Sequence, residues 1–209
     1  QKIFGWLTLN PRLNLKEDWV FRYRKYNSNN PELYDEVEGF LPRHTGSVSM
    51  SANTKIYGVF PFKIGNLETL RHIMTPSISY SWRPNFSEKL FGVDLGYFQW
   101  INGEAYDKFA GSMAGGTPKQ KQKTMGFSLS NQFQAKKKDS EGGISKIDLL
   151  TWNMNSSYNF AADSMRLAPV RSSLRTTLPG GFKLDISMTH DFYQLIKDTT
   201  SQVLKRINI

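Results

Sequence analysis

Histidines and acidic residues most often carry catalysis or bind metals, and few of them are suitably placed in this sequence. The three histidines, His44, His72 and His190, lie too far apart to match a metal-ligand spacing. His190 and Asp191 are adjacent and are the one pair that could serve a hydrolase on a barrel wall. Neighbouring strand residues point to opposite faces, so this pair cannot form a hydrogen-bonded couple without a local distortion. We therefore predict no catalytic residue, no metal and no cofactor, and keep a barrel hydrolase as an alternative.

A glycine-rich segment at residues 115–119 has some likeness to a phosphate-binding loop. It lacks the glycine-lysine-serine/threonine ending of such loops. Pro118 would also remove a backbone N–H donor from the cradle. The sequence predicts a flexible loop tip here.

Basic side chains are the more plausible functional groups. The chain has 27 Lys and Arg against 18 Asp and Glu, a formal net charge of +9, and such a surplus points to an anionic partner, either nucleic acid or a phosphorylated lipid. Arginine binds phosphate bidentately. Seven cations that are expected to face a hydrated lumen are our candidates for lipid-phosphate contact: Arg12, Arg22, Arg71, Arg83, Arg171, Arg175 and Lys183. The alternatives are that lysines such as Lys136–Lys138 solvate loops and that arginines pair with acids such as Asp185 to stiffen the wall.

Composition excludes a helical membrane protein but not a membrane barrel. Hydrophobic residues make up 39% of the 209 residues, mean hydropathy is −0.48, and no run approaches the roughly 18 apolar residues of a spanning helix. A spanning strand needs only about 10 residues, of which every second one faces lipid. Cysteine is absent, which rules out disulfides within this stretch. Because the chain begins at Gln1 without signal-peptide features, we expect an internal piece of a barrel that continues beyond both ends.

Apolar and polar residues alternate over most of the chain, which is typical of strands with one greasy face. Residues 7–15 and 19–24 are predicted to form a hairpin around a turn at Lys16, Glu17 and Asp18. Further strands are predicted at about 46–60, 74–83, 125–134, 151–160, 170–178 and 182–189, with another beginning at 204. Pro76 cannot donate to a strand ladder, so a bulge or an edge position is expected there.

The predicted connections differ in length. Short ones fall at 16–18 and 179–181, a moderate one at 63–70, and long ones at 27–42 and 84–123. Outer-membrane barrels have short periplasmic turns and longer external loops, so the 84–123 loop is predicted to lie outside the cell. The connection at 136–146 is longer than a periplasmic turn should be.

A soluble β-sandwich would show a similar alternation. Two features favour a barrel: the polar faces consist of Ser, Thr, Asn and Gln with scattered Arg, as in a hydrated lumen, and Trp and Tyr lie near strand ends. We predict an all-β chain, an antiparallel transmembrane β-barrel segment with roughly eight to nine strands of a larger barrel. Residues 1–209 are expected to be part of a single outer-membrane β-barrel domain.

Three segments resemble the LptD family in the form found in Bacteroidetes. The most specific is residues 70–86, which carries Arg71-His72, Thr75-Pro76-Ser77 and Arg83-Pro84. Residues 53–58 and 158–164 are similar to further family segments in the same order. The resemblance spans about Trp6 to Tyr193, covers only part of the family's barrel, and is poorest in the long loop.

The resemblance implies an outer-membrane barrel that delivers lipopolysaccharide to the outer leaflet and is not an enzyme. It also implies an LptE-like plug lipoprotein and a periplasmic LptA-like bridge as partners, with the lipid bilayer and without nucleic acid. The lateral opening between the first and last strands that the family implies is not recognisable here. Other outer-membrane channels or porins remain the main alternative.

Overall fold

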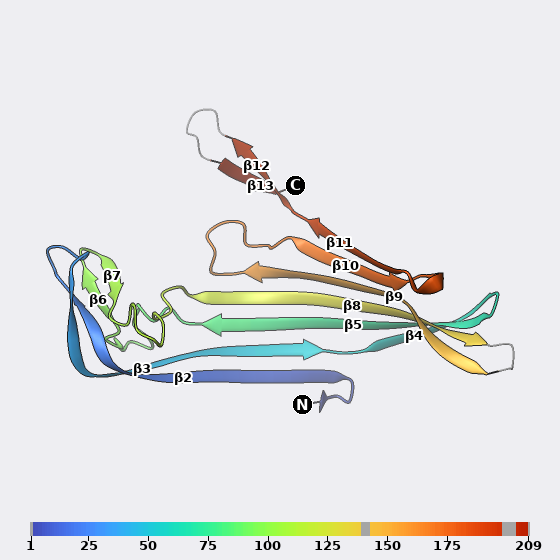
Figure 1. Cartoon of the computed structure of the whole chain (residues 1–209), viewed down its shortest axis with the longest axis horizontal. Helices are drawn as coiled ribbons and strands as arrows, with labels where there is room; N and C mark the ends of the chain where they lie inside the picture. The colour runs from blue at the N-terminus through green and yellow to red at the C-terminus, as the bar shows by residue number, and fades with distance from the viewer. Residues whose placement is uncertain (1, 139–142, 198–203, 209) are drawn as a thin grey trace. The chain divides into compact units, whose positions relative to one another are not determined.

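The computed structural model describes residues 2–138, 143–197 and 204–208, and its regular secondary structure is almost wholly β-strand (Figure 1). A 3-10 turn at Pro179–Gly181 separates two of them. The strands are β1 (Lys2–Ile3), β2 (Leu7–Tyr26), β3 (Tyr34–Asn53), β4 (Ile56–Ile64), β5 (Leu67–Arg83), β6 (Phe98–Ile101), β7 (Glu104–Asp107), β8 (Gln122–Lys138), β9 (Ile144–Asn159), β10 (Val170–Thr177), β11 (Lys183–His190), β12 (Tyr193–Lys197) and β13 (Leu204–Asn208). In the described part of the chain, no helix is long and apolar enough to span a membrane.

The main sheet is antiparallel and nine-stranded, which confirms the predicted fold class. Its order is β1-β2-β3-β5-β8-β9-β10-β11, and β4 also pairs with β5. Among the described strands the sheet does not close on itself, as expected for part of a barrel wall. Two small sheets accompany it, β6 with β7 and β12 with β13. The strand predicted to begin at residue 204 is β13.

Two compact units make up the chain. We call residues Gln1–Asn10, Met50–Tyr80 and Thr124–Ile209 the sheet unit, and residues Pro11–Ser49 and Ser81–Lys123 the loop unit. Strands β2, β3, β5 and β8 contribute residues to both.

The predicted turn at Lys16, Glu17 and Asp18 is wrong, because β2 runs without interruption from Leu7 to Tyr26. The apolar residues on both sides of the supposed turn have odd numbers, which is the alternation of one continuous strand. The charged triplet therefore lies within the strand. What was predicted as a hairpin is a single long strand.

The third predicted strand is also wrong in its bounds. Strand β3 begins at Tyr34, inside the predicted 27–42 connection, and ends at Asn53. The remainder of the predicted strand belongs to β4. The interruption lies opposite Pro76: Thr54 donates its backbone N–H to Pro76 O at 3.3 Å, and Ile56 pairs with Met74. The irregularity expected at Pro76 is thus found in the partner strand.

The connections between the strands of the main sheet alternate between long and short along the chain. The long ones are 27–33, 84–121 and 160–169, and the short ones lie between Ile64 and Leu67, Lys138 and Ile144, and Thr177 and Lys183. The predicted 136–146 connection shortens because Lys136 pairs with Lys146 and Lys138 with Ile144. The longest connection contains the β6–β7 hairpin, so it has structure of its own.

Candidate functional site

Strands β8 to β11 of the sheet unit lie side by side and carry one polar and one apolar face (Figure 1). The pairing register places polar residues opposite one another in three rows: Ser128-Asn155-Arg171-Thr189, Ser130-Asn153-Ser173-Ser187 and Gln132-Thr151-Arg175-Asp185. The intervening rows are mostly apolar: Leu129-Met154-Ser172-Met188, Asn131-Trp152-Leu174-Ile186 and Phe133-Leu150-Thr176-Leu184. A one-residue slip at any pair would mix the faces. The register therefore produces a continuous polar surface across four strands.

Hydrogen bonds between side chains tie this polar face together. Ser130 Oγ donates to Asn153 Oδ1 at 2.6 Å, and Gln134 Nε2 donates to Asp148 Oδ1 at 2.7 Å. A bulge between Phe133 and Gln134 shifts the register here. Hydrogen bonds between uncharged hydroxyls and amides can be replaced by hydrogen bonds to water at little cost in free energy. The surface therefore suits a hydrated interior.

Three of the seven candidate cations lie on this polar face. Arg175 forms an ion pair with Asp185, directly opposite on β11. Lys183 pairs in register with Thr177, and Arg171 with Asn155 and Thr189. The acid pairing considered as an alternative thus applies to Arg175, whereas Arg171 and Lys183 have no carboxylate partner within the described residues.

The other four candidates are spread over different strands. In the sheet unit, the Arg71 guanidinium lies 5.1 Å from the centroid of the Tyr57 ring. In the loop unit, Arg12 is exposed on β2, and Arg22 forms an exposed 3.0 Å ion pair with Glu38. Arg83 ends β5, and its buried Nε lacks a hydrogen-bond partner within the described chain. The structure therefore does not gather the seven into one cluster.

His72 and His44 contact neighbouring side chains of the protein. His72 stacks on Phe133, with ring centroids 4.3 Å apart, and its Nε2 lies 3.0 Å from Asn131 Oδ1. His44 lies 3.5 Å from an exposed Glu17 carboxylate. Asp191, next to His190, accepts a hydrogen bond from the backbone N–H of Tyr193. Within the described ranges, no group of three His, Asp or Glu side chains could hold a metal ion.

The long connection forms a folded layer on one face of β2 and β3 in the loop unit (Figure 1). Val20, on the face of β2 that carries even-numbered residues, is buried with a cluster from the connection: Phe86, Tyr97, Phe98, Ala105 and Phe109. Leu41 of β3 packs against the same cluster. The opposite face stays bare, with Trp19, Phe21 and Phe40 more than half exposed and in ring contact. We call the face of β2 and β3 that packs against this cluster the covered face.

Polar contacts fasten this layer to the strands. The Gln99 side chain accepts from Tyr26 N at 2.9 Å and donates to Tyr26 O at 2.8 Å, as a neighbouring strand would. His44 N donates to Tyr97 Oη at 2.7 Å.

Within the β6–β7 hairpin, Tyr106 donates to Glu104 at 2.8 Å. This bond raises the pKa of Tyr106, because ionisation would break it and place two negative charges side by side.

Arg43 is the central polar anchor and is only 2% exposed. Its guanidinium donates to Asp18 Oδ2 from Nε at 3.1 Å and from Nη2 at 2.8 Å. It also donates to Gly115 O at 2.8 Å, Thr117 Oγ1 at 3.1 Å and Ala114 O at 3.2 Å. One side chain thus satisfies groups from β2 and from the predicted loop tip. The tip is therefore held in place, contrary to the flexible loop predicted at residues 115–119.

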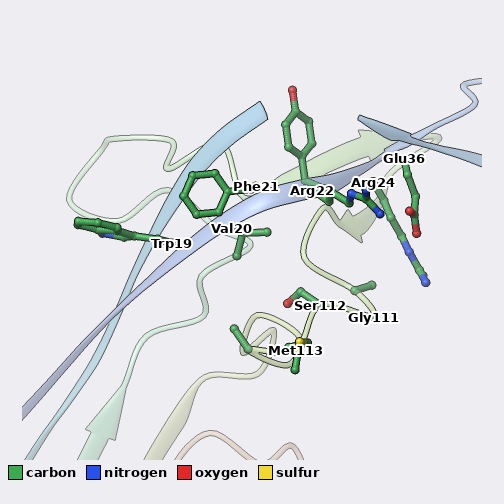
Figure 2. Close-up of a pocket in the computed structure, with 12 residues that line it drawn as sticks. Trp19, Val20, Phe21, Arg22, Arg24, Glu36, Gly111, Ser112 and Met113 are labelled. Atoms are coloured by element: carbon green, nitrogen blue, oxygen red, sulfur yellow. The ribbon is translucent and has the colours of Figure 1, made fainter. Parts of the chain in front are cut away.

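A cavity of about 470 Å³ lies between β2 and residues 110–114 of the loop unit. Figure 2 shows Arg22, Arg24 and Glu36 grouped on one side of it and Trp19 on the other, with Gly111, Ser112 and Met113 across from β2. A carboxylate, two guanidinium groups and a hydroxyl therefore lie around one hollow, whereas the Trp19 ring belongs to the bare face. Of these, only Arg22 is among the predicted site residues.

The sequence patterns do not predict the roles of Arg24, Arg43 and Gly111. Arg43 has an odd number, like the polar residues of β3. Pro42 and the acidic residues before it, however, are more typical of a connection than of a strand. No local pattern marks Arg24 as different from Arg22. The roles of Arg24 and Arg43 depend on partners within residues 111–117, each of which lies more than seventy residues further along the chain.

An unclosed antiparallel sheet with one polar and one apolar face has the features of part of a β-barrel wall of the outer-membrane class. A family model described as LptD protein matches residues 1–193. The chain belongs to the LptD protein family, which is a family of transport and assembly proteins and not of known enzymes. No curated protein and no solved structure matches the chain.

Proposed function

We propose that this chain is part of an outer-membrane barrel wall that transports lipopolysaccharide and inserts it into the outer leaflet without covalent chemistry. The family match over residues 1–193 carries the proposal. The continuous polar face of β8 to β11 supports it, because a hydrated surface lets a charged saccharide pass an apolar wall. Arg171 and Lys183 on that face are the cations we propose for contact with lipid phosphates.

The family also suggests the setting of this activity. The proposal includes an LptE-like plug lipoprotein and a periplasmic LptA-like bridge as partners. It places residues 1–209 in a single barrel domain, with residues 84–123 at the external end. A general porin is the alternative, and it would conduct solutes without affecting lipopolysaccharide.

The function is tested by depleting the full-length protein in its own bacterium and following newly synthesised, radiolabelled lipopolysaccharide. We expect the label to remain with the inner membrane and periplasm instead of reaching the outer membrane. An unrelated outer-membrane porin should assemble normally over the same period, which controls for general envelope damage. Normal delivery of the label after depletion would overturn the proposal.

The orientation of the wall is tested by single cysteines at Leu174 and Arg175 in the full-length protein. These neighbours on β10 point to opposite faces. We expect a lipid-soluble thiol reagent to label position 174 and a water-soluble reagent to label position 175. Aqueous labelling at both positions would mean that the apolar face does not meet lipid.

A further inference from the structure

The cavity between β2 and residues 110–114 has the size and the chemistry of a ligand site. Its volume of about 470 Å³ falls within the range of roughly 300–1,000 Å³ that is usual for small-molecule pockets. One wall is a strand, and the other is a segment that Arg43 fastens through Ala114 O and Gly115 O. Both walls are therefore fixed before any ligand arrives, which lowers the entropy cost of binding.

Arg24 is held rigidly at this cavity. Its guanidinium lies 4.0 Å from the centroid of the Tyr34 ring, and its backbone N–H donates to Lys108 O at 2.8 Å. On the other side it abuts Gly111, where a Cβ atom would come within 2.5 Å of Nη2. Gly111 also has a φ of +80°, which disfavours any other residue there. The close approach of Arg24 thus depends on glycine at this position.

The charge of Arg24 is not neutralised by an ion pair in the described part of the chain, in contrast to that of Arg22, which pairs with Glu38. An immobilised guanidinium without a carboxylate partner favours an anionic ligand, which it can bind through two parallel hydrogen bonds. Arg24 is therefore the cation of the cavity that is available to a ligand anion.

The remaining lining groups point to a ligand that is more than a bare anion. Glu36 would repel an isolated anion, but its carboxylate can accept hydrogen bonds from hydroxyl groups. Ser112 adds a hydroxyl that can donate to or accept from a further sugar hydroxyl. Hydroxyls beside one anionic group are the features of a sugar phosphate or a sugar acid.

We propose that this cavity binds a sugar unit that carries a phosphate or carboxylate group, with Arg24 holding the anionic group and Glu36 accepting from the sugar hydroxyls. The inference rests on the proposed function, because such a sugar would belong to the saccharide part of the transported glycolipid. It assigns recognition of the saccharide to the covered face of the loop unit, separately from the cations on β10 and β11.

The test measures binding of a lipid-free core oligosaccharide, released from lipopolysaccharide by mild acid, to the full-length protein in detergent. Three forms are compared: intact, with its phosphates removed, and with its phosphates removed and its carboxylates reduced. We expect the fully neutral form to bind at least about tenfold more weakly than the intact one. The intermediate form tells whether the anion is a phosphate or a carboxylate. Equal binding of the intact and neutral forms would overturn the proposal.

Variants localise the binding. Arg24→Gln should weaken binding of the intact oligosaccharide at least about tenfold, whereas Lys25→Gln, at the exposed lysine next to Arg24 that does not line the cavity, should leave it unchanged. Hydrogen exchange of the unmodified protein gives a measurement that needs no variant. The oligosaccharide should slow exchange at residues 19–24 and 110–114, and binding without slower exchange there would place the saccharide elsewhere and refute the assignment.

The cellular experiment separates this inference from the proposed function. If depletion blocks delivery of lipopolysaccharide but the oligosaccharide does not bind, the cavity assignment fails and the function stands. If depletion has no effect on delivery, the function fails, and binding at the cavity would then show a glycan site without the transport role.

Discussion

Replacement of Arg43 by alanine is expected to release the layer formed by residues 84–121 from β2 and β3. The change removes every hydrogen bond from the guanidinium to Asp18, Gly115, Thr117 and Ala114. Within the described part of the chain, it also leaves the largely buried Asp18 carboxylate with only the ion pair to Lys16. Breaking a buried ion pair by removing one partner costs about 3–5 kcal/mol, because an uncompensated charge stays in the interior. Hydrogen exchange at residues 110–118 should accelerate by roughly two to four orders of magnitude.

Arg22→Ala provides the matched control for this change. Arg22 also pairs with a carboxylate from β3, but both partners of that pair are well exposed. Exposed pairs contribute about 0–1 kcal/mol, so exchange at residues 110–118 should change by less than about tenfold. If residues 110–118 of the Arg43 variant exchanged as slowly as those of the unmodified protein, the layer would be held by its apolar core alone.

The alternation of residue types was sufficient to predict the fold class and most strands, because the side chains of a strand repeat every two residues whatever the tertiary structure. Its failure at Lys16, Glu17 and Asp18 has a physical cause. Charged residues in a strand usually mark a turn, but here Asp18 is neutralised by Arg43 and Lys16. The partner that makes a charge acceptable in β2 lies on another strand and cannot be found from the local sequence.

The beginning of β3 was missed for a related reason. Pro42 and the acidic residues at 35–38 have low strand propensity, and this part of the chain was assigned to a connection. In the structure the strand is stabilised by what covers it: Leu41 packs on the buried cluster, and Arg43 bonds to the loop. Tertiary packing overrides local propensity at these positions.

The candidate functional groups also divide into those that the local sequence predicts and those that depend on tertiary contacts. Arg171, Arg175 and Lys183 were correctly placed on one face, because parity and short hairpins fix their register. The cavity could not be predicted, because it requires residues 110–114 to fold back on β2. Gly111 gave the only local signal, since a glycine in a loop can allow a close approach, but the sequence does not say to which side chain.

The apolar core of the loop unit makes a second prediction with a large effect, because Phe109 is fully buried and lies at its centre. Its ring packs edge-on against Tyr97 at a centroid distance of 5.6 Å. The Arg43 guanidinium lies 4.8 Å from the centroid of the same ring. Phe109 thus contacts both the apolar cluster and the polar anchor, and its loss should weaken the two together.

Phe109→Ala is expected to destabilise the layer by about 3–5 kcal/mol, the usual cost of removing a buried phenylalanine and leaving a cavity. Limited proteolysis of the full-length protein should then cut within residues 84–121 under conditions in which the unmodified protein stays intact. Phe91→Ala is the control, because Phe91 lies in the same connection but is 90% exposed, and it should leave the cleavage pattern unchanged. Equal resistance of the Phe109 variant would mean that the connection is fastened by its polar contacts. Arg43→Ala would then be the more damaging of the two changes, so the pair of variants separates the two sources of order in this layer.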